Sequence, residues 1–182
     1  MKERRFRNDW INEVRLDEKT GRDQRVPVYQ GAWFRLAPEG RALASKGRIW
    51  APALACGLLL ILFFLADDDA TRSLPVFLPA AAALFPLLYW MMGAWTSLRT
   101  KERFTRLQKE KGFGRVLRSS MGCFALLCIA CAADLVRILS GGGTMAGCAG
   151  LALLAGAALS AFLAFQRQRK IERYIEEQRE AV

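Results

Sequence analysis

The chain has 182 residues but not one histidine. Serine–histidine hydrolysis, histidine-ligated zinc chemistry and histidine proton relays all require that side chain. No glycine-rich loop followed by lysine is available to cradle a phosphate. No pair of acidic residues lies inside an apolar segment, as aspartyl or two-metal catalysis would need. These absences predict a protein that is not an enzyme and that holds no cofactor.

Cysteine is scarce and odd in number, and every cysteine lies in an apolar stretch: Cys56, Cys123, Cys128, Cys131 and Cys148. Cys128 and Cys131 share a helical face with Asp134, a set that could hold a soft metal. Cysteine in an apolar helix is more often a small packing residue. An odd count also fits free thiols better than a disulfide framework. We therefore predict no metal site.

Four long apolar stretches dominate the rest of the chain. They run over Ile49–Ala66, Leu74–Leu98, Ser119–Leu139 and Met145–Phe165. A helix needs about 20 apolar residues to cross a hydrocarbon core of about 30 Å. The sequence therefore predicts an all-α polytopic membrane protein with four transmembrane helices, arranged as two tandem hairpins.

Lysine and arginine are distributed on one side of these spans. Residues 1–48 hold twelve of them, residues 99–118 hold eight and the tail from Gln166 holds five, whereas the hairpin tips at 66–73 and 140–144 hold only Arg72. Basic residues near helix ends stay in the cytoplasm. We expect both termini and the central loop to be cytoplasmic, in the cytoplasmic membrane of a bacterium. The net charge of +10 then reflects topology, and we predict no nucleic-acid binding.

The spans divide the chain into five segments. We expect a cytoplasmic N-terminal segment (1–48), a first hairpin (49–98), a basic cytoplasmic helix and loop (99–118), a second hairpin (119–165) and a cytoplasmic C-terminal helix (166–182). Trp50, Trp90 and Trp95 fall near the predicted inner boundary, where aromatic belts lie.

The second hairpin resembles the first in sequence. With an offset of 67 residues, Cys56 aligns with Cys123 and Asp67 with Asp134; with an offset of 70, Glu102-Arg103-Phe104 aligns with Glu172-Arg173-Tyr174. Leucine- and alanine-rich segments also align by chance. We interpret the match as a duplication, with two parallel repeats related by a pseudo-two-fold axis along the membrane normal.

The N-terminal segment contains a predicted β-hairpin. Val14–Leu16 and Val26–Tyr29 flank a turn that contains Gly21, and Pro27 suits an edge strand. The second strand should continue into Tyr29–Leu36. Because a lone hairpin is marginal in water, it should contact the bundle, the membrane or a partner, with Trp10, Tyr29, Trp33 and Phe34 as candidates. A disordered basic arm is the alternative.

Two charged helices should extend the spans into the cytoplasm. Arg99–Lys111 should continue the second span until Gly112 and Gly114 break it, and Gln166–Arg179 should continue the fourth. Their apolar stripes are narrow, which is typical of surface-lying helices.

Two features stand out inside the spans. Asp134 and Arg137 are their only ionisable residues and, at a spacing of i, i+3, can form an intramembrane ion pair. Small residues recur at every fourth position of the last span, where they would let helices pack closely within the chain or in a homo-oligomer: Cys148, Ala152, Gly156, Ser160 and Ala164.

These features favour a non-catalytic membrane scaffold or accessory subunit that binds a protein partner on its cytoplasmic face. Candidate partner or lipid contacts are Trp33 and Phe34 together with the basic residues Arg103, Arg106, Lys109 and Lys111. One alternative is a small-molecule or ion transporter or channel subunit, with Asp134 as its functional charge. The other is a protein that senses anionic lipids through the basic loop.

The topology makes a direct labelling prediction. In a cysteine-free background, cysteines at Asp68 and Gly142 should react with an impermeant thiol reagent on intact cells, and one at Lys109 should not. The reason is that only the hairpin tips face outward under the basic-residue bias. Labelling at 109 but not at 68 would invert the topology.

Overall fold

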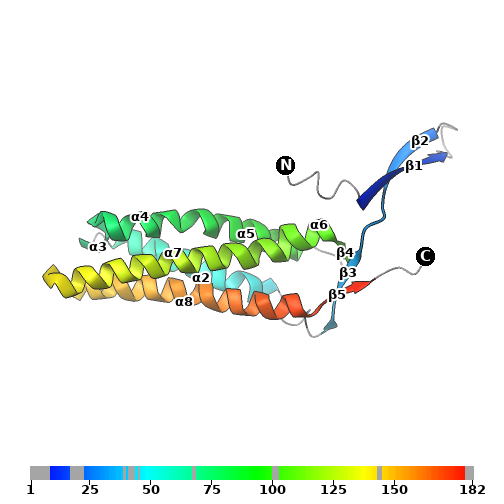
Figure 1. Cartoon of the computed structure of the whole chain (residues 1–182). Coiled ribbons are helices and arrows are strands. Elements are labelled where there is room, and N and C mark those ends of the chain that lie inside the picture. Colours follow the sequence, from blue (N-terminus) through cyan, green and yellow to red (C-terminus); the bar gives the residue numbers. More distant parts are fainter. Residues whose placement is uncertain are drawn as a thin grey trace.

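A computed structural model describes residues 9–16, 23–38, 40, 44, 46–66, 69–99, 103–142 and 145–178. Long helices lie side by side in one bundle, and all the β-strands lie at one end of it (Figure 1). Four helical stretches are long and apolar enough to cross a membrane. The four predicted spans are therefore confirmed by length and composition. Gly21, Asp67, Asp68 and residues 179–182 lie outside the described residues.

The first two spans form the first antiparallel pair of helices. Helix α2 covers Lys46–Leu65, and the short α3 covers Asp69–Arg72. The second span is built from α4 (Leu74–Ala82) and α5 (Leu84–Leu98), which meet at Ala83. Ala83 keeps helical dihedral angles, φ −64° and ψ −19°. Pro86 has no N–H to donate to the preceding turn of the helix. The second span is therefore interrupted at Ala83, but no loop forms there.

The third span is longer than predicted, and its extension corrects one prediction. Helix α5 ends at Leu98, and strand β4 (Arg103–Thr105) follows. The third span then begins at the basic residue Arg106. It consists of α6 (Arg106–Lys109), the π-helical turn η2 (Glu110–Gly114), α7 (Arg115–Arg137) and η3 (Ile138–Gly142). The prediction that Arg99–Lys111 extends the second span, and that Gly112 and Gly114 end a helix, was wrong.

Local chemistry explains this start of the third span. Thr105 forms a capping box with Gln108: its backbone N–H donates to Gln108 Oε1 at 3.0 Å, and its Oγ1 accepts from the Gln108 N–H at 3.4 Å. Gly112 lies against α5, where a Cβ would come 2.9 Å from Ser97 Oγ. The glycine therefore permits a close helix contact inside a helical segment instead of ending it.

The bundle interior is apolar and the outer surface is apolar too. Leu60, Phe63, Trp90, Leu127 and Leu154 are fully buried among the four spans. Side chains such as Phe85 and Leu139 are 78% and 77% exposed. Large exposed apolar side chains all round a bundle are what lipid contact requires. Trp90 is a core residue, so its predicted place in an aromatic belt was wrong.

Two cysteines from different hairpins meet in the bundle interior. The Sγ atoms of Cys56 in α2 and Cys123 in α7 lie 3.9 Å apart, and both residues are fully buried. Around this contact α2 packs on α8, and the second span packs on α7.

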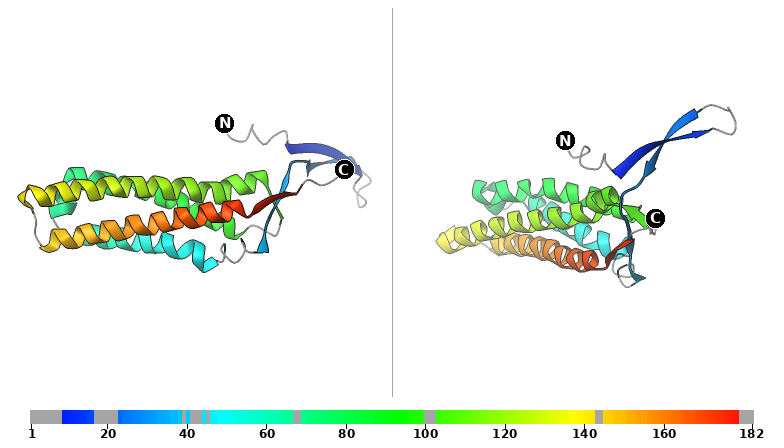
Figure 2. Two further views of the ribbon diagram at one scale, coloured as in Figure 1. Left: turned by 60° about the horizontal axis from the view of Figure 1, so that its bottom comes forward. Right: turned by 45° about the vertical axis from the view of Figure 1, so that its right-hand side comes forward.

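The N-terminal hairpin is present as predicted. Strand β1 (Trp10–Leu16) pairs antiparallel with β2 (Asp23–Tyr29), and Pro27 lies opposite Asn12. The hairpin projects away from the bundle in every view (Figures 1 and 2). The chain beyond Tyr29 leaves this sheet, so the predicted continuation of the second strand to Leu36 was wrong.

A second sheet was not predicted from the sequence. Strand β3 (Trp33–Leu36) lies between β4 and β5 (Ile175–Gln178), antiparallel to both. Helix α8 (Met145–Arg173) therefore stops before β5. The predicted C-terminal helix is correct only as far as Arg173, because the residues after it pair with β3.

Close packing of α5 on α7 predicts a test of the fold. A Cβ at Gly93 would lie 3.0 Å from Val116 Cγ2 and 3.1 Å from the Val116 backbone nitrogen. Gly93→Ala should lower the thermal midpoint in detergent, since overpacking costs about 1–3 kcal/mol. Gly122→Ala is the matched control, because its Cβ would meet Pro86 at an ordinary 3.8 Å. Equal midpoints for the two variants would contradict this packing.

Candidate functional site

A small second core lies beneath strand β3 at the strand-bearing end of the bundle. Phe34, Leu36, Phe104, Phe113 and Ile171 are all buried there. The Phe104 ring lies 6.3 Å from Phe34 and 5.6 Å from Phe113. Phe104 was predicted to lie on a surface helix. It is instead in a strand, and it joins the N-terminal segment to the third span.

A buried hydrogen bond links η2 to α8 in the same region. Gln168 donates from Nε2 to the carbonyl oxygen of Phe113 at 3.3 Å, and Gln168 is 3% exposed. A π-helical turn shifts the normal pattern of backbone hydrogen bonds, and a side chain of α8 supplies a donor for this carbonyl. This hydrogen bond thereby helps to set the position of α8 along the axis of the third span.

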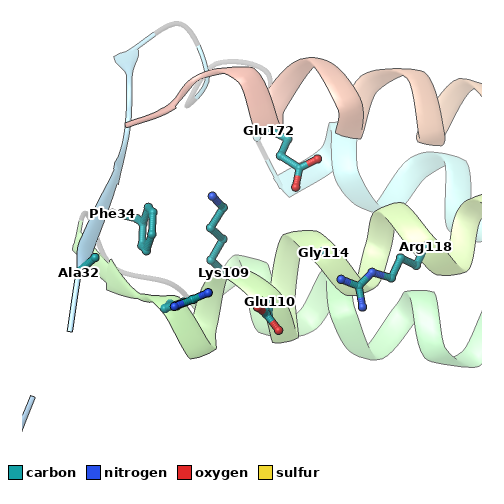
Figure 3. Close-up of a pocket in the computed structure, with 8 residues that line it drawn as sticks. Ala32, Phe34, Lys109, Glu110, Gly114, Arg118 and Glu172 are labelled. Atoms are coloured by element: carbon teal, nitrogen blue, oxygen red, sulfur yellow. The ribbon is translucent and has the colours of Figure 1, made fainter. Parts of the chain in front are cut away.

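A pocket of about 450 Å³ lies between the start of the third span and the end of α8, with β3 closing one end (Figure 3). Lys109 and Glu172 extend into the pocket from opposite walls (Figure 3). The lining residues are Ala32, Phe34, Arg106, Lys109, Glu110, Gly114, Arg118 and Glu172. Three cationic and two acidic side chains thus surround one space.

The charged side chains of the pocket are held apart. Within the described part of the chain, none of the five forms an ion pair. The Lys109 ammonium lies 4.5 Å from the centre of the Phe34 ring, a cation–π contact. The Arg106 backbone N–H donates to Tyr29 Oη at 3.1 Å. These charged side chains of the lining are therefore available to contact a ligand.

The predicted partner or lipid contacts are partly brought together here. Arg106, Lys109 and Phe34 line the pocket, and Lys111 is exposed outside it. Trp33 packs edge-on against Tyr29, with ring centres 5.1 Å apart, and Arg103 contributes its backbone to β4. Because Phe34 is buried, it serves the second core and the pocket and does not reach an external partner.

Sequence reasoning missed Glu110, Arg118 and Glu172 as pocket residues. Arg118 was counted only as a topology signal. Glu110 and Glu172 are isolated acidic residues in basic segments, and 62 positions separate them in the sequence. The packing of α8 on α7 brings Glu172 opposite the start of the third span, and no local pattern in the sequence marks either glutamate as a lining residue.

Two cation–aromatic pairs, each a guanidinium stacked on an aromatic side chain, lie on the bundle next to this end. The Arg99 guanidinium lies 4.6 Å from the Trp95 ring centre, and that of Arg115 lies 4.5 Å from the Tyr89 ring centre. Trp50 packs edge-on against Trp95 at 6.4 Å. Tyr89 and Trp95 are exposed. Amphipathic rings with cations beside them are typical of a membrane–water interface.

Asp134 and Arg137 lie at the opposite end of the bundle and form the expected ion pair. Arg137 Nε donates to Asp134 Oδ1 at 2.9 Å. Asp134 is fully buried, and its Oδ2 has no hydrogen-bond partner among the described residues. A buried carboxylate oxygen without a donor is costly. This buried carboxylate oxygen is a feature of the described spans that favours the transporter alternative.

The small residues of α8 follow a line from its exposed to its buried side. Cys148 and Ala152 are exposed, Gly156 and Ser160 are half-buried, and Ala164 is buried. A Cβ at Gly156 would lie 3.2 Å from Leu59 Cδ1, so this glycine contacts α2. The buried face of α8 is formed by other residues, among them Gly147, Gly150, Leu154, Ala157 and Ala161. Packing between two copies of the chain at Cys148 and Ala152 stays a prediction.

Comparison of the chain with protein-family models, with curated proteins and with solved structures returned no match.

The ion pair predicts a coupling that can be measured. Asp134→Ala and Arg137→Ala should each lower the thermal midpoint in detergent, because a single change leaves one charge in a poorly hydrated place, at a cost of about 3–5 kcal/mol. The double variant should be more stable than the sum of the single losses implies. If the losses simply add while ion flux into proteoliposomes disappears in each single variant, the pair serves transport instead.

Proposed function

We propose that this protein is a non-catalytic integral membrane scaffold or accessory subunit, and that it binds a protein partner through the β1–β2 hairpin on the cytoplasmic side. The observation that carries the proposal is an uncovered hairpin fixed firmly to the membrane bundle. The absence of histidine and of a phosphate-binding loop supports a non-catalytic role.

The cytoplasmic assignment rests on the asymmetry of charge. The bundle end that bears the strands carries Arg99, Arg115 and Arg118, with aromatic rings beside the first two. In the described part of the other end the basic residues are Arg72 and the ion-paired Arg137. Because basic residues are retained on the cytoplasmic side, the hairpin and both termini are assigned to the cytoplasm.

The exposure of the hairpin suits a partner surface. Trp10, Ile11 and Val14 are 43%, 46% and 60% exposed. Successive strand residues point to opposite faces, so apolar groups are exposed on both faces of β1. No third strand pairs with β1 or β2 in the described part of the chain. A two-stranded sheet alone is marginal in water, and a partner would supply the missing burial.

The base of the hairpin is rigid. Tyr29 packs between Trp10 and Trp33, with ring centres 5.2 and 5.1 Å away. Its hydroxyl donates to the Ala32 carbonyl at 3.0 Å and accepts from the Arg106 N–H at 3.1 Å. A partner held by the hairpin is thereby connected to the first turn of the third span.

The two edges of the hairpin differ in what they offer. Pro27 in β2 has no N–H, and a proline in a strand is tolerated where that N–H would face away from the sheet. Proline on an edge also protects it from strand addition. Strand β1 contains no proline, so its outer edge is the better template for an added strand of the partner.

We also infer that the two transmembrane hairpins are parallel repeats. The offset of 67 residues makes Cys56 and Cys123 equivalent, and two equivalent residues touch each other only where they lie on the symmetry axis. Their 3.9 Å contact supports this reading. An exchange of the two hairpins also maps the packing of α2 on α8 onto the packing of α7 on the second span.

The partner surface is tested by site-specific cross-linking in intact cells. A photoreactive residue at Ile11 should give a discrete cross-linked protein, whereas one at the lipid-facing Phe85 should not. Asn12→Pro should reduce the product about tenfold or more, since Asn12 lies opposite Pro27 and a proline there would block the outer edge of β1. Asn12→Ser is the matched control. Equal cross-linking in the Asn12→Pro and Asn12→Ser variants would rule out strand addition at β1.

A further inference from the structure

We propose that the pocket between the third span and α8 binds a zwitterionic phosphate ester that carries a primary amine, the chemistry of a phosphoethanolamine headgroup. This ligand site is separate from the partner surface proposed on the hairpin. The inference rests on the charge of the lining, its place in the bundle and its size.

The mixture of charges decides between ligand classes. Arg106, Lys109 and Arg118 offer donors that suit a phosphate. Glu110 and Glu172 line the same space, and they would repel a ligand that is only anionic. A ligand with a phosphate and a nearby ammonium satisfies both sets. A primary ammonium has three N–H donors for carboxylates, whereas a trimethylated one has none.

The place of the pocket favours a headgroup. Arg118 lies less than one helical turn beyond Arg115, whose guanidinium stacks on the exposed Tyr89. A turn of helix rises about 5.4 Å, so the inner end of the pocket lies within a few ångströms, along the helix axis, of the cation–aromatic pairs. Because such pairs mark a membrane–water interface, the pocket lies at the depth of lipid phosphates.

The walls divide the recognition between two spans. Arg118, Glu110 and Lys109 come from the third span, and Glu172 comes from α8 (Figure 3). Phe34 closes the end and carries the Lys109 ammonium on its ring at 4.5 Å. In this arrangement the phosphate lies against the arginines and Lys109, and the ammonium lies against Glu172 and Glu110. A volume of about 450 Å³ falls in the range of about 300–1,000 Å³ for small-molecule pockets.

The same chemistry could come from a membrane lipid or from a soluble phosphoethanolamine. The full-length protein in detergent is titrated with phosphatidylethanolamine, phosphatidylglycerol and phosphatidylcholine, and bound lipid is counted by native mass spectrometry. Phosphatidylethanolamine should bind about tenfold more tightly than either other lipid, the factor expected from about 1.4 kcal/mol of added charge-assisted bonding. Free phosphoethanolamine competes in a parallel arm. Displacement at low micromolar concentration indicates a soluble ligand, and displacement only at millimolar concentration indicates the lipid; both results support the pocket.

Substitutions separate recognition from simple loss of structure. Glu172→Gln should weaken phosphatidylethanolamine about tenfold while leaving phosphatidylglycerol unchanged or tighter, and Glu110→Gln should act in the same direction. Arg118→Gln should weaken both lipids. Glu176→Gln and Arg167→Gln are matched controls, because both residues are exposed and neither lines the pocket. A variant that fails to fold would lose all lipids together, so the ratio of the two affinities is the informative readout.

Two results would overturn the proposal. The first is phosphatidylglycerol binding to the natural sequence as tightly as phosphatidylethanolamine, which would show a site for anions alone. The second is that the Glu172→Gln and Glu110→Gln variants both keep the preference of the natural sequence for phosphatidylethanolamine over phosphatidylglycerol. That result would show that the carboxylates do not recognise an amine.

Discussion

The pairing of β3 with strands from both halves of the chain is the constraint on which the strand-bearing end of the bundle depends. Strand β4 follows the second span and β5 follows the fourth, and each pairs with one edge of β3. Four residues of the N-terminal segment thereby fix the end of α8 beside the start of the third span. Without β3 the second core would lose Phe34 and Leu36, and the pocket would lose one wall.

Physical signals in the sequence explain what could be predicted. A membrane span needs a long apolar run that no soluble element shares, so four spans were evident from composition. The β1–β2 hairpin was evident from β-prone residues around a turn. Strand β5 of the second sheet carries no such signal: it reads Ile-Glu-Glu-Gln, three of whose residues favour helix. Pairing with β3 overrides that local preference, which is a tertiary effect.

The start of the third span was missed for a different physical reason. Glycine in a charged segment usually ends a helix, and Gly112 and Gly114 were interpreted in that way. Gly112 instead removes a side chain where η2 meets Ser97 of α5. The π-helical turn and the Gln168 bond to Phe113 accommodate the close approach. A glycine that ends a helix and one that permits a contact look alike until the neighbouring helix is placed.

The pocket and the hairpin share one short piece of chain, and this links the two proposed binding surfaces. Tyr29 holds the base of the hairpin and accepts a hydrogen bond from Arg106, whose side chain lines the pocket. Ala32 and Phe34, a few residues on, line it as well. A ligand that shifts β3 or the backbone of Arg106 would therefore shift the hairpin base, and a partner that shifts the hairpin base would alter the pocket. Because coupling between two binding equilibria is reciprocal, the ligand proposed for the pocket and the partner proposed for the hairpin would each influence the affinity of the other.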